Sequence, residues 1–328
     1  FLNAVGDETK LLFVGDWNQL PSVEPGFLLH DLVNSDKFHY FELSSTHRQK
    51  KDSSICINRD LILEGKTELI QDSHFIIKRF HNDSEARMEA KRIFETLYDP
   101  VNYQKLHVIT PQQSGTIGVQ GLNLLAQEIF HNADEDHICY GEDCFYRFDK
   151  VMTVRNVYGD ESYFNGNLWL VHDFCSEEMI LSADDDTNVH IHEDHYEDIA
   201  LAYATTVHKY QGSEGEIIVI VLPSDVALSM ISRSILYTAV TRAIDKVIIL
   251  SSENMLERFI TADIHPQRNS GIVDKLEKIL EEKAKEYANI PMLSHTHGQN
   301  ATPTTVGKEI SIFVYRINRI LNKLKQEK

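Results

Sequence analysis

The stretch TTVHKYQGSE at residues 205–214 leads through Gly215 into the apolar run EIIVIVL at residues 216–222. Hydroxyl, imidazole, ammonium, amide and carboxylate side chains are gathered directly before a run of β-branched residues, which is typical of a buried strand. Further along, LYTAVTRA at residues 236–243 precedes a second apolar run, KVIIL at residues 246–250. These segments predict a functional site mounted on two buried strands.

Length and composition favour a globular protein of about two domains. The chain has 328 residues, of which 42% are hydrophobic and 25% are charged. These proportions are those of ordinary folded proteins. No apolar run approaches the roughly 20 residues of a membrane helix, and no signal peptide pattern is found at the start. We therefore expect a cytoplasmic protein with no membrane partner.

The formal net charge of −18 argues against general attraction to nucleic acid, because phosphate contacts need local positive charge. Any DNA groove must then be a local basic feature of an acidic protein. The cysteines are Cys56, Cys139, Cys144 and Cys175, and they lack the CxxC spacing of a zinc site. We expect all of them to be reduced thiols.

Strand and helix patterns alternate over the first part of the chain. Apolar runs at residues 11–14, 75–80 and 107–110 predict strands, and a helix is expected over residues 83–98, where alanines and large apolar residues share one face. Another helix is expected to end near Leu63. Alternation of this kind predicts an α/β fold with a parallel sheet.

The run at residues 11–14 ends at Gly15-Asp16, and the loop WNQLP follows. In doubly wound sheets, groups just beyond the carboxyl end of a strand face the ligand crevice, which places Asp16 and Gln19 at a site. Because Phe1 has no preceding Met and this strand lacks earlier partners, we expect the sequence to begin partway through a domain.

The pattern changes between Cys139 and Asp198. Short apolar runs separated by turn signals predict a small antiparallel barrel inserted into the α/β domain. His190 and His192 share one face of the last run and could hold a metal. A solvated acidic hairpin is the preferred interpretation, so no metal site is predicted.

Two amphipathic helices are expected near the end of the chain, at residues 272–287 and at about residues 309–325. The second helix is basic. The polar stretch SHTHGQNATPTT at residues 294–305 is interpreted as a linker between them.

Motif spacing resembles the RecD family, the exodeoxyribonuclease V alpha subunit and its stand-alone relatives, which are superfamily 1 DNA helicases. The matching stretches are GDWNQLPSV at 15–23, HRQ with Ser54-Ile55 at 47–55, VITPQQSGTIGVQGLN at 108–123, KVMTVRNVY to FNG at 150–166, and TTVHKYQGSE with YTAVTRA at 205–243. The resemblance covers roughly residues 11 to 250. It implies RecA-like P-loop NTPase lobes with a parallel sheet and an inserted SH3-like β-barrel.

The resemblance also implies domain boundaries. Residues 1–45 would end the first RecA-like lobe, residues 46–138 and 201–255 would form the second lobe, residues 139–200 the SH3-like barrel, and residues 256–328 a helical extension. The phosphate-binding pattern GxxxxGK[ST] does not occur in the sequence. We therefore expect the ligands of ATP and Mg²⁺ to come largely from a part that precedes residue 1.

The function implied by the resemblance is that of an ATP-dependent DNA helicase. It would move 5′→3′ on single-stranded DNA in recombination or repair, with RecBC-like subunits as candidate partners, and the chain alone would hydrolyse almost no ATP. Two alternatives stay open. One is a non-catalytic module that binds DNA or a partner through the barrel and the basic last helix, and the other is the helicase part of a relaxase-type protein.

By resemblance, Gln19, Arg48 and Arg242 form the catalytic set at the γ-phosphate. An amide can donate to a phosphate oxygen and accept from a water, and a guanidinium stabilises developing charge on the phosphoryl group. Asp16 and Glu214 would complete the nucleotide site, with Glu214 near the sugar. The alternatives are a turn-capping role for the glutamine and surface ion pairs for the arginines.

The DNA-facing residues implied by the resemblance are Thr110, Asn156, Thr206, His208, Lys209 and Tyr210. Hydroxyl and ammonium groups suit phosphate contacts, which hold a strand without sequence choice. Tyr210 departs from the family, where a small hydroxyl residue is usual at this position. It either stacks on a base or packs inside, and packing is the preferred interpretation.

Overall fold

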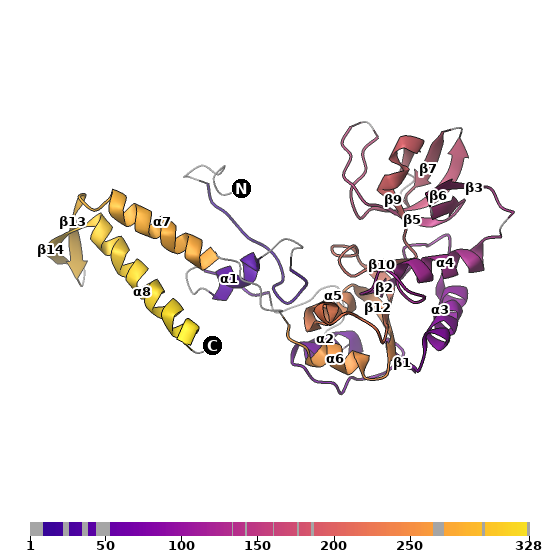
Figure 1. Cartoon of the computed structure of the whole chain (residues 1–328), viewed down its shortest axis with the longest axis horizontal. Coiled ribbons are helices and arrows are strands. Elements are labelled where there is room, and N and C mark those ends of the chain that lie inside the picture. Colours follow the sequence, from indigo (N-terminus) through magenta and orange to yellow (C-terminus); the bar gives the residue numbers. More distant parts are fainter. Residues whose placement is uncertain are drawn as a thin grey trace. The chain divides into compact units, whose positions relative to one another are not determined.

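The computed structural model describes residues 9–21, 26–34, 39–43, 53–132, 134–141, 143–159, 161–175, 177–184, 187–264, 272–296 and 299–326 (Figure 1). The chain divides into two compact units. The first unit comprises Phe1–Trp17, Pro21–Phe41 and Gln267–Lys328, and the second comprises Asn18–Leu20 and Glu42–Pro266. Among the described residues, no helix combines the length and the apolar character that crossing a membrane requires.

A five-stranded parallel sheet of order β1-β12-β11-β2-β10 forms the base of the second unit. Its strands are β1 (Phe75–Phe80), β2 (Leu106–Thr110), β10 (Ala204–Thr206), β11 (Gly215–Leu222) and β12 (Ala243–Ser252). The two apolar runs that follow the polar motifs are thus adjacent strands, with Val219 opposite Ile248. The predicted α/β fold with a parallel sheet is confirmed.

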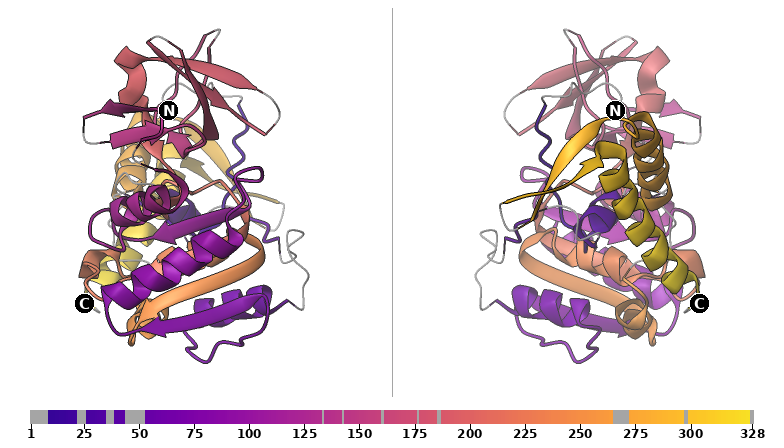
Figure 2. Two further views of the ribbon diagram at one scale, coloured as in Figure 1. Left: turned by 90° about the vertical axis from the view of Figure 1, so that its right-hand side faces the viewer. Right: turned by 90° about the vertical axis from the view of Figure 1, so that its left-hand side faces the viewer.

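Helices cover both faces of this sheet (Figure 2). The helices on one face are α2 (Ser54–Leu63), α5 (Arg233–Val240) and α6 (Met255–Thr261), and those on the other are α3 (Asp83–Leu97) and α4 (Val119–Phe130). Ile218 and Ile220 of β11 join the first core, whereas Val219 and Val221 join the second. Because both faces are buried, the strand needs the uninterrupted apolar sequence that it has.

A second five-stranded sheet, antiparallel and of order β8-β7-β6-β5-β9, lies in sequence between α4 and β10. Its elements are β5 (Lys150–Thr153), β6 (Leu168–Cys175), β7 (Glu178–Ser182), β8 (Asn188–His192), the 3₁₀ helix η2 (Glu193–Asp198) and β9 (Ile199–Leu201). The predicted antiparallel strands are confirmed. Within the described part of the chain, edge strands β8 and β9 do not pair with each other, and the SH3-like barrel stays a prediction.

The hairpin of β3 (His137–Tyr140) and β4 (Asp143–Tyr146) joins α4 to this antiparallel sheet. It forms a separate two-stranded ribbon. The inserted segment therefore consists of a short hairpin followed by a four-stranded meander, β5 to β8, and a strand β9 that returns to pair with β5.

The predicted strand at residues 11–14 is wrong. Residues 9–16 have irregular backbone, and the side chains of Leu12 and Val14 are 88% and 86% exposed. A strand needs a neighbour to pair its backbone groups, and no strand of the described chain pairs with this run. Asp16 therefore does not follow a strand end, and the helix of this region is α1 (Leu28–Asn34).

The two helices expected near the end of the chain are confirmed as α7 (Ile272–Glu286) and α8 (Val306–Gln326). The linker expected between them is wrong. That part of the chain forms an antiparallel hairpin, β13 (Pro291–Thr296) and β14 (Gln299–Thr305), in which Met292 faces Thr304. Threonines are frequent in β14, and their β-branched side chains favour a strand over a flexible linker.

Candidate nucleotide and DNA site

A buried arginine lies at the centre of the candidate nucleotide site. Arg242 follows α5 and is only 5% exposed. Its Nε donates to the Thr238 carbonyl oxygen at 3.3 Å, and one Nη donates to the Ser213 carbonyl oxygen at 3.2 Å. The other Nη donates to the side-chain oxygen of Gln19, which lies 223 positions away in the sequence. The fold thus brings together two of the residues that the resemblance assigns to the γ-phosphate.

Within the second unit, the segment that carries Gln19 is held in place by contacts of the next residue, Leu20. The Leu20 amide donates to Thr238 Oγ1 at 2.9 Å, and Gln211 Nε2 donates to the Leu20 carbonyl oxygen at 3.0 Å. The Leu20 side chain is buried in the core on the α2 and α5 face of the sheet. These contacts hold the Gln19 amide against the Arg242 guanidinium.

The other predicted nucleotide-site residues differ in what the structure says of them. Asp16 is exposed and belongs to the first unit, and Arg48 lies outside the described residues. Glu214 is exposed and directly follows Ser213, whose carbonyl oxygen accepts from Arg242. Contacts of these three side chains with a nucleotide remain predictions.

Tyr210 packs inside the molecule. Its side chain has no exposed surface, and its ring is stacked on that of His107 with centroids 3.7 Å apart. The hydroxyl donates to the Glu214 carbonyl oxygen at 2.9 Å, and burial raises its pKa. A Cβ at Gly215 would lie 3.1 Å from this hydroxyl, so glycine permits the close approach. The packing alternative is therefore the one that the structure shows.

The predicted contacts of Tyr210 and Thr110 with DNA would need surface that neither side chain exposes in this structure, and they stay predictions. Thr110, the last residue of β2, is also fully buried. A side chain without exposed surface cannot contact a nucleic acid from where it lies. Burial of Thr110 follows from the parallel sheet, which buries β2 on both faces.

The end of β10 and the turn after it carry three other residues of the predicted DNA contact, Thr206, His208 and Lys209. Thr206 Oγ1 accepts from the Lys209 amide at 3.3 Å, and the Thr206 carbonyl oxygen accepts from the Tyr210 amide at 3.1 Å. This turn leaves His208 and Lys209 exposed while Tyr210 is buried. In this arrangement Tyr210 anchors the turn, and His208 and Lys209 are accessible for the predicted contacts with a DNA backbone.

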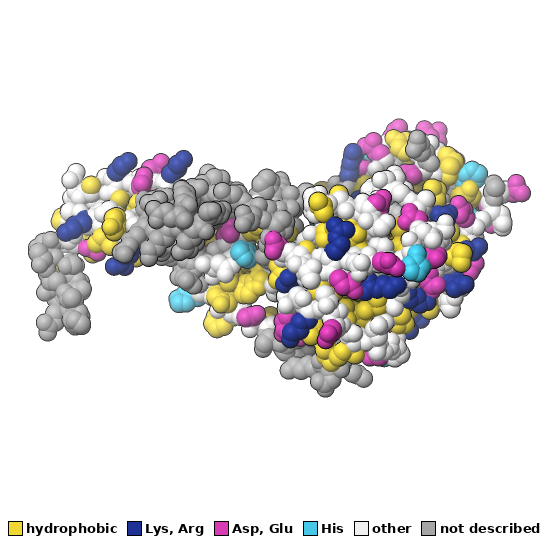
Figure 3. All heavy atoms as spheres, turned by 60° about the horizontal axis from the view of Figure 1, so that its bottom comes forward, with side chains coloured by type: hydrophobic (Ala, Val, Ile, Leu, Met, Phe, Trp, Pro, Cys, Tyr) yellow, Lys and Arg dark blue, Asp and Glu magenta, His cyan; other side chains and the backbone are white. Residues whose placement is uncertain are grey.

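Asn156 lies apart, in the loop that follows β5. It is exposed, and its Oδ1 accepts from the Asn165 amide at 2.8 Å, which closes the loop between β5 and β6. On the face shown in Figure 3, the Lys and Arg side chains of the second unit are interspersed with Asp and Glu side chains. This distribution agrees with the acidic composition of the chain.

Sequence reasoning missed a buried lysine that joins the antiparallel sheet to the polar motif. Lys150 opens β5 and has no exposed surface. Its Nζ donates to the Leu106 carbonyl oxygen at 2.8 Å and lies 3.3 Å from His107 Nδ1. Nε2 of the same histidine lies 2.7 Å from Thr205 Oγ1, and its ring stacks on Tyr210. One continuous chain of contacts therefore runs from β5 to the TTVHKYQGSE segment.

Burial lowers the pKa values of both Lys150 and His107. Burial lowers the pKa of the Lys150 ammonium from its usual 10.5 to about 7. Burial also lowers the pKa of His107 well below its usual value, and the nearby Lys150 lowers it further. The imidazole is therefore neutral at physiological pH, with one nitrogen able to donate and the other to accept.

Asp149, the neighbour of Lys150, is also fully buried and was also missed. Its carboxylate accepts from Gln127 Nε2 at 2.6 Å and from the Tyr203 hydroxyl at 2.9 Å, and His131 Nε2 lies 3.1 Å away. Burial is the largest single influence and acts to lower the pKa of His131, but the nearby carboxylates of Asp149 and Glu135 together outweigh it, so the pKa is raised. Asp149 thus fastens the start of β5 to α4, just as Lys150 fastens it to β2.

The prediction of reduced thiols is wrong for two of the cysteines. Cys139 and Cys144 face each other across the β3–β4 hairpin and form a disulfide, whereas Cys56 and Cys175 form none. Cross-strand neighbours in an antiparallel pair are close enough for such a bond. That pairing depends on the hairpin register, which the cysteine spacing does not reveal.

The histidines of β8 contact carboxylates. His190 Nδ1 lies 3.0 Å from Glu178, and His192 Nδ1 lies 3.4 Å from Asp194. These side chains are partly exposed. These contacts agree with the interpretation of this run as a solvated acidic hairpin.

Three protein-family models match separate parts of the chain. The UvrD-like helicase C-terminal domain matches residues 201–250, the AAA domain matches residues 1–78, and a model described as Lyase matches residues 267–328. The first of these matches covers the polar motif with β11 and Arg242. The last falls wholly within the first unit.

The most similar relatives also fall into two groups, helicases and lyases. The chain is 30% identical over 276 residues to the ATP-dependent RecD2 DNA helicase of Deinococcus radiodurans, covering 84% of this chain and 37% of the relative. It is 24% identical over 353 residues to the RecBCD enzyme subunit RecD of Haemophilus influenzae, covering 85% of this chain and 52% of the relative. It is also 44% identical over 61 residues to the adenylosuccinate lyase of Dictyostelium discoideum, covering 19% of this chain and 12% of the relative.

Among solved structures, Bacteroides Pif1 bound to single-stranded DNA is similar with a TM-score of 0.47 and 15% identity, over 82% of this chain and 66% of that one. Likeness at this level carries no argument about the site. The sequence similarity to the helicases is long, and it includes the AAA and UvrD-like matches. Outside residues 267–328, which are similar to the lyases, the chain belongs to the RecD-like superfamily 1 DNA helicases.

Proposed function

We propose that the RecD-like part of this chain forms the γ-phosphate-sensing half of an ATP-dependent DNA helicase. The observation that carries the proposal is the contact between the Arg242 guanidinium and the Gln19 amide. The chain spans 37% of the RecD2 relative, and the pattern GxxxxGK[ST] does not occur in its sequence, so we assign the remaining ATP and Mg²⁺ ligands to other parts of the helicase.

The contacts of Arg242 suit a residue that exchanges partners. Two of them are to backbone carbonyl oxygens, of Thr238 and Ser213, which fix the guanidinium in place. The third is to a side-chain amide, which can rotate when a phosphate oxygen takes its place. A rotated Gln19 could then donate its NH₂ group to the same phosphate. Loss of the γ-phosphate would restore the direct contact, so the pair has two arrangements that report the nucleotide state.

A further part of the proposal concerns DNA. His208 and Lys209 lie exposed on the turn whose inner residue, Tyr210, is packed on His107. We assign these two side chains to the phosphate backbone of single-stranded DNA, where contacts hold the strand without reading its sequence. Lys209→Gln should then weaken DNA binding and reduce the slope of log affinity against log salt by about 0.7, the single-strand value per phosphate contact.

Several finer assignments belong to the same proposal. We propose 5′→3′ movement, Mg-ATP as cofactor, a cytoplasmic role in recombination or repair, and RecBC-like subunits as candidate partners. The predicted boundaries of the lobes and of the SH3-like barrel are kept as proposed divisions. Residues 267–328 are left out, because the matching segment spans only 12% of the lyase relative.

The experiment is ATP hydrolysis by the gene product that contains this chain, at its full length, with and without single-stranded DNA. Arg242→Lys keeps the charge but loses the paired donors, so DNA-stimulated hydrolysis should fall by about 10³-fold, at the lower end of what removing an arginine finger costs. Arg92→Lys is the matched control, because Arg92 is exposed and contacts only Glu89 among the ion pairs described. Equal stimulation in Arg242→Lys and wild type would overturn the proposal.

A further inference from the structure

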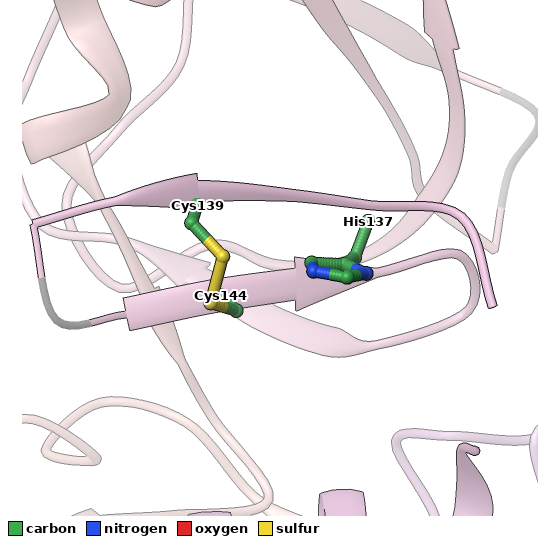
Figure 4. Close-up of side chains that lie close together, drawn as sticks. All are labelled: His137, Cys139 and Cys144. Carbon is green, nitrogen blue, oxygen red and sulfur yellow. A yellow bond between two sulfur atoms is a disulfide. The ribbon is translucent and has the colours of Figure 1, made fainter. Parts of the chain in front are cut away.

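The β3–β4 hairpin gathers two cysteines and one histidine on one face (Figure 4). Cys139 and Cys144 are direct cross-strand partners, and His137 lies two residues before Cys139 on the same strand. Alternate residues of a strand share a face, so all three side chains point the same way. One ligand atom from each of them lies within 4.8 Å of the others.

The imidazole is already oriented as metal-bound histidines are. His137 Nδ1 lies 2.8 Å from the Glu135 carbonyl oxygen. A carbonyl oxygen can only accept, so Nδ1 carries a proton, and the neutral form of this ring has its lone pair on Nε2. Metal-ligating histidines nearly always donate their other ring nitrogen to a carbonyl or carboxylate in this way. The ring of Tyr146, with its centroid 4.9 Å from that of His137, packs beside the imidazole.

We propose that reduction of the Cys139–Cys144 disulfide turns this hairpin into a zinc site with His137, Cys139 and Cys144 as ligands. Thiolate sulfur and neutral imidazole are the donors that Zn²⁺ prefers, and three protein ligands leave a fourth tetrahedral position for water. With Zn–S bonds of about 2.3 Å, two sulfurs on one tetrahedral zinc lie about 3.8 Å apart. Cross-strand cysteines reach that spacing by side-chain rotation, without separation of the strands.

The redox step balances with a dithiol reductant. One thiolate of the reductant attacks a hairpin sulfur, the disulfide breaks, and a mixed disulfide forms. The second thiolate of the reductant then displaces the remaining cysteine, so two electrons pass to the hairpin and the reductant leaves as a disulfide. Zn²⁺ binds the two thiolates, and two protons are released from the thiols. Disulfide and zinc are mutually exclusive, because the same sulfurs serve both.

Either cross-link acts on a strand that is fastened to the rest of the unit. The Cys144 carbonyl oxygen accepts from Gln127 Nε2 at 2.8 Å, and that nitrogen also donates to the buried Asp149. The hairpin is thus anchored to α4 at the point where the antiparallel sheet begins. Disulfide and zinc would be alternative ways to close the hairpin there, one under oxidising and one under reducing conditions.

The test is zinc binding by the whole chain, oxidised or reduced with a phosphine that does not itself bind the metal tightly. We expect one equivalent of Zn²⁺ to bind to the reduced chain in competition with a chromophoric chelator, and none to the oxidised chain. Co²⁺ in place of Zn²⁺ should give the sulfur charge-transfer and tetrahedral d–d absorption of a thiolate site. Cys139→Ser and His137→Ala should each lose this site.

Controls for the site come from the other cysteines. Cys175→Ser removes an exposed cysteine and Cys56→Ser removes a buried one. Neither cysteine is disulfide-bonded, and both variants should bind zinc as the wild type does. Equal binding in the oxidised and reduced chains would overturn the proposal, as would thiolate absorption that survives in Cys139→Ser or depends on Cys175. Should Cys139→Ser fail to fold, His137→Ala decides the matter, because His137 is exposed. An unchanged Co²⁺ spectrum in that variant would exclude the histidine ligand.

Discussion

Replacing Lys150 with methionine should change how stability depends on pH. Lys150 has no exposed surface, and burial lowers its pKa from 10.5 to about 7. Between these two pH values the unfolded chain binds the proton more readily than the folded chain does. Stability conferred by this position therefore rises with pH from about 7 to 10.5, and the full cost of the buried ammonium is present below that window.

The size of the effect follows from the same two values. A difference between 10.5 and about 7 corresponds to a free energy on the order of 5 kcal/mol, at about 1.4 kcal/mol per pH unit. Lys150→Met keeps an unbranched side chain, one heavy atom shorter, and removes the charge. It also removes the hydrogen bond to the Leu106 carbonyl oxygen, which costs about 1 kcal/mol. We expect the variant to be more stable than wild type by about 4 kcal/mol near pH 6.

The assay is urea unfolding of both proteins at a series of pH values from 6 to 10. The difference in unfolding free energy between Lys150→Met and wild type should shrink steadily as pH rises, because deprotonation removes the cost in the wild type. Lys209→Met is the matched control, since Lys209 is exposed and its loss should leave the pH dependence unchanged. Parallel curves for Lys150→Met and wild type would refute the reasoning.

Two further predictions concern the contacts around the inserted sheet and the polar motif. Asp149→Asn should lower the pKa of His131. In the wild type the stabilising contribution of His131 is present below its unfolded pKa of about 6.5 and is lost as pH rises through the raised folded pKa. NMR titration of the imidazole measures this pKa, and an unchanged value in the variant would contradict the prediction. Tyr210→Ala should destabilise the second unit by about 3 to 5 kcal/mol through the cavity it leaves, whereas Tyr210→Phe should cost only about 1 kcal/mol for the hydrogen bond to Glu214. Chemical unfolding of both variants checks the second prediction, and similar losses for Ala and Phe would contradict it.

The parallel sheet could be predicted because its strands are buried on both faces. Such strands must be apolar throughout, and β11 and β12 therefore stand out in the sequence. Helix boundaries followed from local chemistry in the same way. Asn82 caps α3 by accepting from the Glu85 amide at 3.0 Å, and this capping needs no knowledge of the tertiary fold.

The buried charged residues could not be predicted, because their burial depends on which elements of the fold pack around them. A lysine at the start of a strand is ordinarily exposed, and only the approach of β2 shows that Lys150 is not. The disulfide of Cys139 and Cys144 likewise depends on the hairpin register. The contact between Gln19 and Arg242 could not be predicted from sequence patterns either, because the two residues are far apart in the chain. Their joint assignment came from family resemblance alone.

Some predictions failed because a local pattern was read without its surroundings. The apolar residues 11–14 have the composition of a buried strand, yet no described strand pairs with them. Residues 294–305 were expected to be a linker because they are polar, yet β13 (Pro291–Thr296) and β14 (Gln299–Thr305) pair with each other. Hydrophobicity alone does not decide between strand and loop, because a strand also needs a neighbouring strand to pair with.

The central claim is that Gln19 and Arg242 together sense the γ-phosphate, and it is tested most directly by coupling between nucleotide and DNA. The measurement is single-stranded DNA affinity of the gene product that contains this chain, at its full length, with ADP and with a non-hydrolysable ATP analogue. The two affinities should differ in the wild type by about 5-fold to 150-fold, the usual range of such coupling.

The decisive variant is Gln19→Glu, which keeps an acceptor for Arg242 but cannot donate to phosphate. The account predicts equal DNA affinity with ADP and with the ATP analogue in this variant, at an unfolding free energy close to that of the wild type. Full retention of the difference in Gln19→Glu would contradict it.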